Sequence, residues 1–382
     1  MTKKKELELY LHIPFCVRKC AYCDFLSFSS GKDKQREYME RLLDEIHVVG
    51  EQCREYRIST IFVGGGTPSS LDSKWIVEMM KRIRERFVIA EGAEISLEAN
   101  PGTVTEEKLS DYRRAGINRL SFGLQSADNR ELSLLGRIHT WEEFLESFHM
   151  ARQAGFANLN VDLMSGLPGQ SLASWKETIK KTAGLEPEHI SAYSLILEEG
   201  TPFFERYSAG GPESRFLPDE DTEREMYHQT RSLLGSFGYE RYEISNYARP
   251  GKECLHNLGY WTDVPYRGLG LGASSYMEGE RFCNESDLGL YLKGSFRERK
   301  QVQRLTKKEQ QEEFFFVGLR LVRGVSLKEF ERRFGVPATA VYPGVMERFV
   351  REGAARLENG WFKLTELGLD VSNYVMRGFL QE

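Results

Sequence analysis

The sequence predicts an α/β protein built on a parallel sheet, with a small helical domain near its carboxyl end. Two observations indicate this class: short apolar segments alternate with helical patterns through the first half of the chain, and the composition changes after about residue 297. Because strand–helix units joined by right-handed crossovers form parallel sheets, the alternation indicates either a barrel or an open α/β sheet. In both folds ligands bind at the carboxyl ends of the strands.

The alternation consists of six strands and the helices between them. The predicted strands are Leu7–Ile13, Ile58–Val63, Glu94–Glu98, Asn118–Phe122, Asn158–Met164 and His189–Leu197. The predicted helices are Asp33–Val49, Ser73–Phe87, Thr105–Ala115, Thr140–Ala154 and Ser171–Ala183. Thr105 followed by Glu106 and Glu107 is typical of a helix N-terminus, since a hydroxyl and carboxylates stabilise the free amide groups there.

The second half of the chain is less regular. It predicts a helix at Asp219–Leu234, a short strand near Tyr242–Ile244 and a hairpin at Arg356–Leu364. Residues 297–382 hold 16 Lys and Arg against 12 Asp and Glu, a weak basic excess that a solvated surface explains better than DNA binding. We expect the parallel-sheet unit over residues 1–200, an irregular extension of it over 201–296 and a helical or winged-helix-like domain over 297–382.

The overall composition excludes several classes of protein. The chain carries 52 Lys and Arg against 57 Asp and Glu, a net charge of −5, and 40% of its residues are hydrophobic. This balance excludes a disordered chain and gives no general attraction to nucleic acid. No apolar run approaches the roughly 20 residues that span a bilayer. The charged start, Met1–Glu8, lacks the apolar core of a signal peptide, so we expect a cytoplasmic protein.

Three of the six cysteines, Cys16, Cys20 and Cys23, follow the first predicted strand within eight residues. Clustered thiols in a cytosolic chain point to a metal or an iron–sulfur cluster. Because a [4Fe-4S] cluster usually takes four cysteines, three would leave one iron open to another ligand. The alternatives are a zinc site completed by His12 or Cys254, and thiols without a metal. Of the other cysteines, Cys53 and Cys283 lack partners and are expected to be structural.

Polar and glycine residues follow the ends of the later strands. Gly64, Gly65, Gly66 and Thr67 end the second strand, where exposed amide groups can receive a ligand. Further candidates at successive strand ends are Glu98, Gln125, Arg137 and Asp162. Each of these taken singly has an ordinary structural explanation, but as a set at one edge of the sheet they predict a single pocket.

The CxxxCxxC loop after a strand that carries Tyr10 resembles that of the radical S-adenosylmethionine (SAM) superfamily. Nearly the whole chain resembles its coproporphyrinogen III oxidase-like, HemN-related family. The resemblance implies a partial (β/α)6 barrel, a [4Fe-4S] cluster on the three cysteines, SAM at the open iron and an electron donor such as flavodoxin or ferredoxin. It implies SAM contacts from Tyr10, Gly65 and Glu98, and an adjacent position, which holds a second SAM in the oxidase, lined by Tyr22, Gly66, Thr67, Gln125, Arg137 and Asp162.

Within that family the sequence departs from the true oxidase. Asp24 and Phe25 follow the third cysteine where the oxidase carries Gly-Cys, and the oxidase's N-terminal extension is missing before Cys16. The element His256-Asn257-x-x-Tyr260-Trp261 is similar to that of the heme-chaperone branch of the family. These features favour a chaperone that binds heme and passes it to an acceptor hemoprotein at a membrane.

Histidine is a common axial ligand of heme iron, and aromatic side chains can form an apolar wall for the macrocycle. His256 is the candidate ligand, with Tyr260, Trp261 and Tyr266 close in sequence. The ordinary alternative is that these are buried packing residues. Two rival functions remain: an oxygen-independent coproporphyrinogen III dehydrogenase, which the SAM pocket favours, and a zinc-binding regulator that uses the C-terminal domain on DNA.

Overall fold

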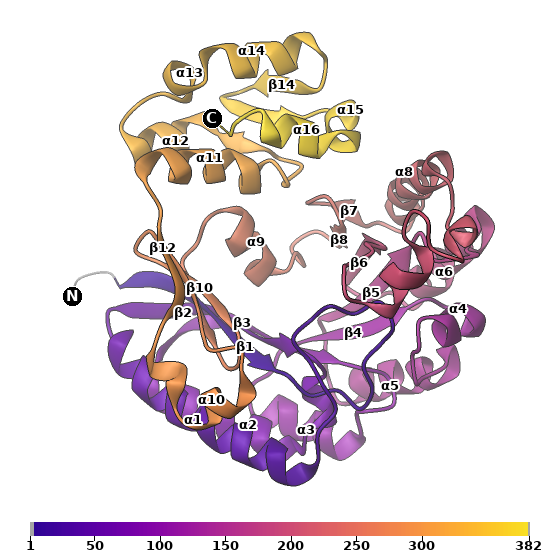
Figure 1. Ribbon diagram of the computed structural model, residues 1–382, viewed down its shortest axis with the longest axis vertical. Coiled ribbons are helices and arrows are strands. Elements are labelled where there is room, and N and C mark those ends of the chain that lie inside the picture. Colours follow the sequence, from indigo (N-terminus) through magenta and orange to yellow (C-terminus); the bar gives the residue numbers. More distant parts are fainter. Residues whose placement is uncertain (1–3, 381–382) are drawn as a thin grey trace.

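The computed structural model describes residues 4–380, and within this range twelve strands form one twisted, open sheet whose centre is six parallel strands in chain order (Figure 1). These strands are β1 (Lys5–Ile13), β2 (Tyr56–Gly65), β3 (Val88–Ala99), β4 (Arg119–Gln125), β5 (Leu159–Ser165) and β6 (His189–Ser194). The predicted α/β class and its parallel sheet are thus confirmed. β3 begins earlier than predicted because Val88 and Ile89 already pair with β2, ahead of an irregularity in that ladder.

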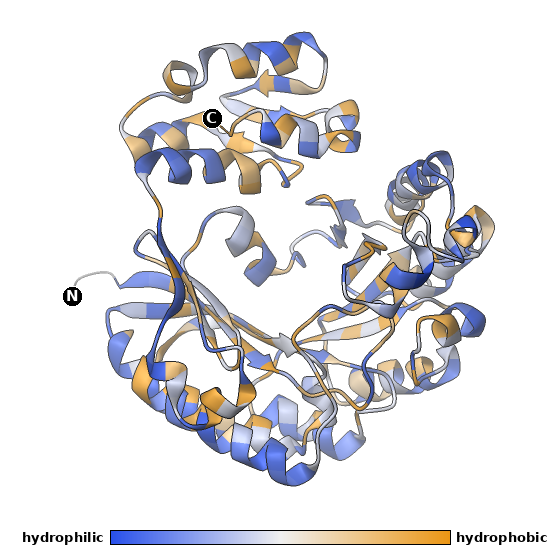
Figure 2. Ribbon diagram, viewed as in Figure 1, coloured by the Kyte–Doolittle hydropathy of each residue, from blue (hydrophilic) through white to orange (hydrophobic). Residues whose placement is uncertain are grey.

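Helices cover the outer face of the parallel strands, with polar residues outward (Figures 1 and 2). The predicted helices are α1 (Lys32–Gln52), α2 (Ser73–Arg86), α3 (Glu106–Arg114), α5 (Trp141–Gln153) and α6 (Leu172–Ala183). The Thr105 side chain accepts a hydrogen bond from the Lys108 amide, so the predicted cap is confirmed. The sequence did not predict α4 (Asn129–Leu134), a short helix that Asp128 caps. Among the described residues no helix combines the length and apolar composition of a bilayer span.

The central strands are extended at both edges of the sheet. Beside β1 lie β9 (Tyr266–Leu269), β10 (Ser274–Met277), β11 (Glu280–Cys283) and β12 (Lys300–Arg304). Beside β6 lie β8 (Asn246–Ala248) and β7 (Glu240–Arg241). The strand predicted near Tyr242–Ile244 is wrong, because this segment is the turn that joins β7 to β8. There the buried Glu243 carboxylate accepts hydrogen bonds from the Ser245 amide and the Asn246 side chain.

The remaining helices before the C-terminal region follow β2 or β6 or connect the outer strands. They are η1 (Pro68–Ser70), α7 (Pro202–Tyr207), η2 (Ser214–Phe216), α8 (Glu220–Ser236), α9 (Leu255–Trp261), α10 (Leu288–Leu292) and η3 (Ser295–Arg297). The helix α9 lies between the sheet and the C-terminal region (Figure 1). It carries His256, Tyr260 and Trp261, and the sequence did not predict a helix at these residues.

The C-terminal region has its own aromatic core, to which Phe315, Phe330, Phe349 and Phe379 contribute. Its helices are α11 (Lys307–Gly318), α12 (Leu327–Phe334), α13 (Ala338–Val341), α14 (Pro343–Arg351), α15 (Glu366–Asp370) and α16 (Ser372–Arg377). Its sheet has the order β13 (Val325–Ser326), β15 (Trp361–Leu364), β14 (Ala355–Glu358). The predicted hairpin is confirmed: Asn359 and Gly360 have φ of 50° and 78°, as a two-residue type I′ turn requires.

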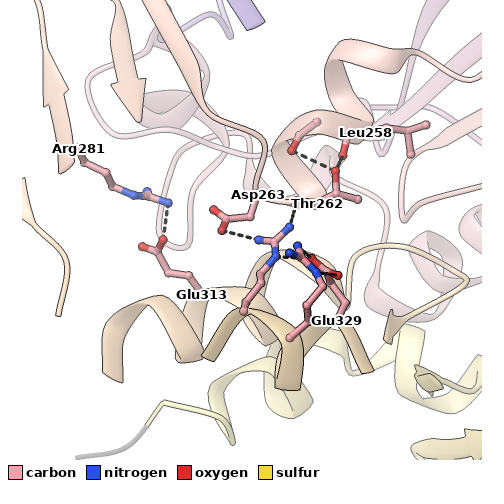
Figure 3. A network of polar contacts seen from close by, with 9 residues as sticks. Leu258, Thr262, Asp263, Arg281, Glu313 and Glu329 are labelled. Carbon is pink, nitrogen blue, oxygen red and sulfur yellow. Dashed lines mark hydrogen bonds and ion pairs between the residues drawn. The ribbon is translucent and has the colours of Figure 1, made fainter. Parts of the chain in front are cut away.

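Charged side chains join this region to the end of α9 (Figure 3). Arg333 of α12 donates to the Asp263 carboxylate over 2.8 Å and to the Thr262 carbonyl over 2.9 Å. Arg281 of β11 donates to Glu313 of α11 over 2.9 Å. The C-terminal region therefore holds the end of the helix that begins beside His256.

Candidate functional site

The thirteen residues singled out from the sequence line two adjoining cavities at the carboxyl ends of the strands and within the barrel. The larger cavity has a volume of about 530 Å³ and its wall includes Tyr10, Tyr22, Cys23, Glu98, Gln125, Asp162 and His256. The smaller cavity, of about 120 Å³, is lined by Cys16, Cys20, Tyr22, Cys23, Gly65, Gly66, Thr67, Glu98, Gln125, Arg137 and Asp162. Their walls share residues, so the structure brings the predicted set together as one continuous site.

The three clustered cysteines are reduced, partly buried and face the smaller cavity. Burial raises the pKa of the Cys23 thiol, and the nearby thiols of Cys20 and Cys16 raise it further. Within residues 4–380 no three Cys, His, Asp or Glu side chains gather closely enough to hold a single metal ion. An iron–sulfur cluster is held differently, because each thiolate binds a separate iron.

Gly65 and Gly66, opposite these cysteines, pack too closely against other parts of the chain for a larger residue to fit. A Cβ atom at Gly66 would lie 3.0 Å from the Cys16 sulfur and 2.7 Å from the Phe15 carbonyl oxygen. Gly65 has a φ of 114° and donates its amide to the Glu98 carboxyl group over 3.0 Å. A side chain at either position would therefore clash or strain the backbone. Three thiols that face a cavity of about 120 Å³ fit a cluster with one iron left for another ligand.

A chain of hydrogen bonds links two of the thiols through Asn100. The Thr67 hydroxyl donates to the Cys16 sulfur over 3.6 Å and accepts from the Asn100 amide group over 2.8 Å. The Arg137 guanidinium donates to the Asn100 oxygen over 2.7 Å and to the Cys20 sulfur over 3.5 Å. Asn100 was not among the site residues predicted from the sequence, although its place just beyond the end of β3 is a signal that could have identified it.

Two acidic side chains lie where the cavities meet. Burial, together with the nearby Asp162, raises the pKa of Glu98 to about 8 against the opposing hydrogen bond from Gly65. Burial also raises the pKa of Asp162, whose carboxylate accepts hydrogen bonds from Ser121 over 3.1 Å and Asn160 over 2.8 Å. Glu98 is thus a buried acid that changes its charge near neutral pH.

The alternative zinc ligands are engaged elsewhere in the fold. The His12 ring contacts the Tyr10 hydroxyl over 3.0 Å and the Leu26 carbonyl over 2.8 Å. The buried Cys254 thiol donates to Glu94 over 3.4 Å, and burial raises its pKa to about 12. Both residues therefore hold together the structure around the cavity.

His256 lies in the wall of the larger cavity with its ring packed against Phe62, at 5.2 Å between ring centres. Its Nδ1 atom is hydrogen-bonded to the Thr60 hydroxyl over 2.7 Å, and its Nε2 atom to the Tyr260 hydroxyl over 3.0 Å. Burial and the nearby Arg119 lower its pKa to about 3, so the imidazole is neutral. A neutral imidazole can bind iron once one of its nitrogens gives up its present partner.

The aromatic residues near His256 separate in space. Tyr260 lines the larger cavity, whereas Trp261 faces a different cavity of about 310 Å³ against the C-terminal region. There the Arg320 guanidinium lies 4.4 Å from the Trp261 ring centre. Tyr266 packs edge-on against Tyr260, with 4.8 Å between ring centres. The expectation of one aromatic wall from these three residues is therefore wrong. Tyr260 and Trp261 are successive on α9 and so point to different faces of the helix, and Tyr266 lies on β9 outside the cavity wall.

The fold and sequence can be compared with known proteins. Residues 10–182 match the radical SAM superfamily and residues 305–371 the HemN C-terminal domain. The chain is 37% identical to heme chaperone HemW of Bacillus subtilis over 98% of this chain and 99% of that protein. It is 36% identical to heme chaperone HemW of Escherichia coli over the full length of both. Coproporphyrinogen III oxidase (HemN) of Escherichia coli has the same fold, with a TM-score of 0.86 at 22% identity over 99% of this chain and 90% of that one. The chain therefore belongs to the HemW family of radical SAM proteins.

Proposed function

We propose that this protein is a heme chaperone, which binds heme in the larger cavity and passes it to an acceptor hemoprotein. The observation that carries the proposal is identity of 36–37% over essentially the whole chain to proteins named for that function. A neutral imidazole in the wall of a cavity of about 530 Å³ supports it, because such a group can bind heme iron.

Membership of the superfamily implies a [4Fe-4S] cluster and SAM. We propose that Cys16, Cys20 and Cys23 hold the cluster, which supplies an electron to SAM bound at its open iron. The backbone around Gly65, together with Glu98, supports a SAM site beside it, since these groups can receive the amino and carboxylate groups of an amino acid.

We assign the neighbouring residues to the same ligand space. Tyr10 lines the larger cavity beside Glu98, which lines both cavities, and in this proposal it contacts SAM where the two cavities meet. The residues proposed to line the adjacent position are Tyr22, Gly66, Thr67, Gln125, Arg137 and Asp162. Arg137 is already held by Cys20 and Asn100, so we assign it to the support of the thiols as much as to a second ligand.

The proposal extends to partners and location. We expect a cytoplasmic chaperone that takes electrons from a donor such as flavodoxin or ferredoxin, has an acceptor hemoprotein at a membrane and binds no nucleic acid. We divide the chain into a barrel (1–200), an extension that carries His256 (201–296) and a C-terminal domain (297–382). The separate aromatic core of the last part supports its boundary.

The test is heme binding and transfer by the full chain, reconstituted anaerobically and with its iron and sulfide measured. Heme is titrated into the protein, and the loaded protein is then mixed with apomyoglobin as a general acceptor. We expect a Soret band with about one heme per chain and its transfer to apomyoglobin. Absence of heme binding by protein with an intact cluster would overturn the proposal.

The same preparation tests the rival dehydrogenase. It is incubated with SAM, a strong reductant and coproporphyrinogen III, and the oxidised porphyrins are separated by chromatography beside a working oxidase. We expect no protoporphyrin, because Asp24 and Phe25 occupy the loop position where the oxidase carries Gly-Cys, and both line the larger cavity. Protoporphyrin formed over many turnovers would instead identify the protein as a dehydrogenase.

A further inference from the structure

Arg119, the first residue of β4, is a buried cation in the wall of the larger cavity, with 2% of its surface exposed. Within residues 4–380 its side chain makes a single hydrogen bond, a long one of 3.4 Å to the Ser96 hydroxyl. In the same range its Nε atom has no partner and no carboxylate oxygen lies within 4.0 Å of the guanidinium. A guanidinium has five N–H groups to satisfy, so most of this one's donor capacity is unused.

Glu94 and Asp162, whose charges act on Arg119, already accept hydrogen bonds from other donors. Glu94 accepts the backbone amides of Leu255 and His256. Asp162 accepts from Ser121 and Asn160. These carboxylates act on Arg119 through their charge and make no ion-pair contact with it. A buried charge is costly unless a partner of opposite charge contacts it.

Arg267 shows what a structural arginine looks like in this fold. It is almost as buried, but its Nη1 atom donates to the Gly268 carbonyl over 2.9 Å and to the Ser275 hydroxyl over 2.8 Å. Its guanidinium also lies 4.0 Å from the Glu45 carboxylate. Arg119 lacks such protein partners and borders empty space, which indicates that its partner is a bound anion.

The position of Arg119 indicates which occupant supplies that anion. Arg119 lines the larger cavity together with His256, and it lies close enough to the imidazole to lower its pKa. It is absent from the wall of the smaller cavity, where the cysteines and Gly65 lie. The anion therefore belongs to the ligand of the larger cavity rather than to SAM beside the cysteines.

We propose that Arg119 binds a propionate carboxylate of the heme that occupies the larger cavity. This inference rests on the heme-chaperone proposal. The planar guanidinium matches a carboxylate with two parallel hydrogen bonds, which are stronger than neutral ones in a buried site. With the iron at His256 and a propionate at Arg119, heme is held at two points and enters the cavity in one orientation.

The test compares heme with heme dimethyl ester, in which both propionates are esterified and uncharged. Each is titrated into the reconstituted full chain and into Arg119→Lys, Arg119→Met and Arg249→Met. Arg249, which is paired with Glu186, lies outside both cavity walls and controls for the loss of one positive charge. We expect the wild type and Arg249→Met to bind heme about ten- to a hundredfold more tightly than its dimethyl ester, because hydrogen bonds to a charged group stabilise by a corresponding amount.

We expect Arg119→Lys to keep part of this preference and Arg119→Met to lose it, while both bind the ester like the wild type. Equal affinity of the wild type for heme and its ester would overturn the inference and leave heme binding intact. No binding of either ligand would overturn the heme-chaperone proposal together with it. A loss of SAM affinity in Arg119→Lys with the preference for heme unchanged would make SAM the source of the carboxylate. If Arg119→Met does not fold, Arg119→Lys decides between these outcomes.

Discussion

The Nε2 atom of His256 and the hydroxyl of Tyr260 are hydrogen-bonded over 3.0 Å, one turn apart on α9. Thr60 holds the other ring nitrogen from the sheet below. Iron that binds at Nε2 must therefore displace the Tyr260 hydroxyl. The helix α9 thus carries both His256, the candidate iron ligand, and Tyr260, the residue that occupies its nitrogen.

Replacing Tyr260 with Phe is expected to increase the affinity for heme by about two- to tenfold, because a net hydrogen bond of roughly 0.5–1.5 kcal/mol no longer competes with iron. Tyr266→Phe is the control, since Tyr266 packs against Tyr260 without bonding the imidazole. Affinity is measured from the Soret band. His256→Ala should weaken binding and shift the band; unchanged spectra in that variant would exclude His256 as the ligand.

Cys20→Ser is expected to abolish the visible absorbance of the cluster and to lower the iron content of reconstituted protein, because a hydroxyl replaces an iron-binding thiolate. Cys283→Ser, a partly exposed thiol on β11, is the control and should keep both. Absorbance that survives in Cys20→Ser would refute the assignment of this ligand.

Asn100→Ala is expected to keep the iron but to make the cluster potential more negative. The change removes the group that orients Thr67 and Arg137 toward the two sulfurs, and hydrogen bonds to sulfur raise the potential of a cluster. The potential is measured by a redox titration followed by electron paramagnetic resonance. Ser69→Ala is the control, because Ser69 bonds only the Asn100 backbone amide within this chain of contacts. An unchanged potential would show that Asn100 has no such role.

Glu8 lies on β1 beneath α9, and burial raises its pKa to about 9. The same carboxyl ionises near pH 4.5 in the unfolded chain, so between these values the folded state binds a proton that the unfolded state lacks. Stability therefore falls as the pH rises through this window.

In the wild type, the unfolding free energy should fall between pH 5.5 and 8.5. In Glu8→Gln this fall should be smaller by at least about 1 kcal/mol, which is less than the energy of a shift of one pKa unit. Urea denaturation at both pH values measures it. Glu6→Gln changes an exposed carboxylate of the same strand and should leave the difference as in the wild type. A pH dependence of Glu8→Gln equal to that of the wild type would contradict the expected burial.

Arg333→Ala should loosen the end of α9, since it removes the bonds to Asp263 and the Thr262 carbonyl (Figure 3). We expect faster amide hydrogen exchange in residues 255–263, because charge-assisted bonds stabilise that end. Arg332→Ala is a matched control, because Arg332 is exposed and bonds Glu329 of its own helix. Equal amide hydrogen exchange in residues 255–263 of the two variants would show that the contacts of Arg333 with Thr262 and Asp263 do not restrain α9.

The sequence predicted those parts of the site that are contiguous in the chain or that end successive strands. Cys16, Cys20 and Cys23 lie on one loop, and Gly65, Glu98 and Gln125 lie at the ends of the neighbouring parallel strands β2, β3 and β4, so alternation alone places them at one edge. The sequence did not predict Arg119 as a site residue, because it lies at the beginning of β4 and not at its end. Arg119 stands out because its guanidinium has few hydrogen-bond partners, and which partners it has depends on residues distant in the chain.

What the sequence determined by itself is the alternation of strands and helices that forms a parallel sheet, the loop with its three thiols and the family to which the chain belongs, since these depend on local pattern. Tertiary structure alone decided that α9 lies inside the open barrel, that Tyr260 occupies the Nε2 atom of His256, and that Trp261 faces another cavity. The physical reason is that hydrogen bonds and buried charges depend on distances between segments far apart in the chain, and these distances are fixed only once the chain has folded.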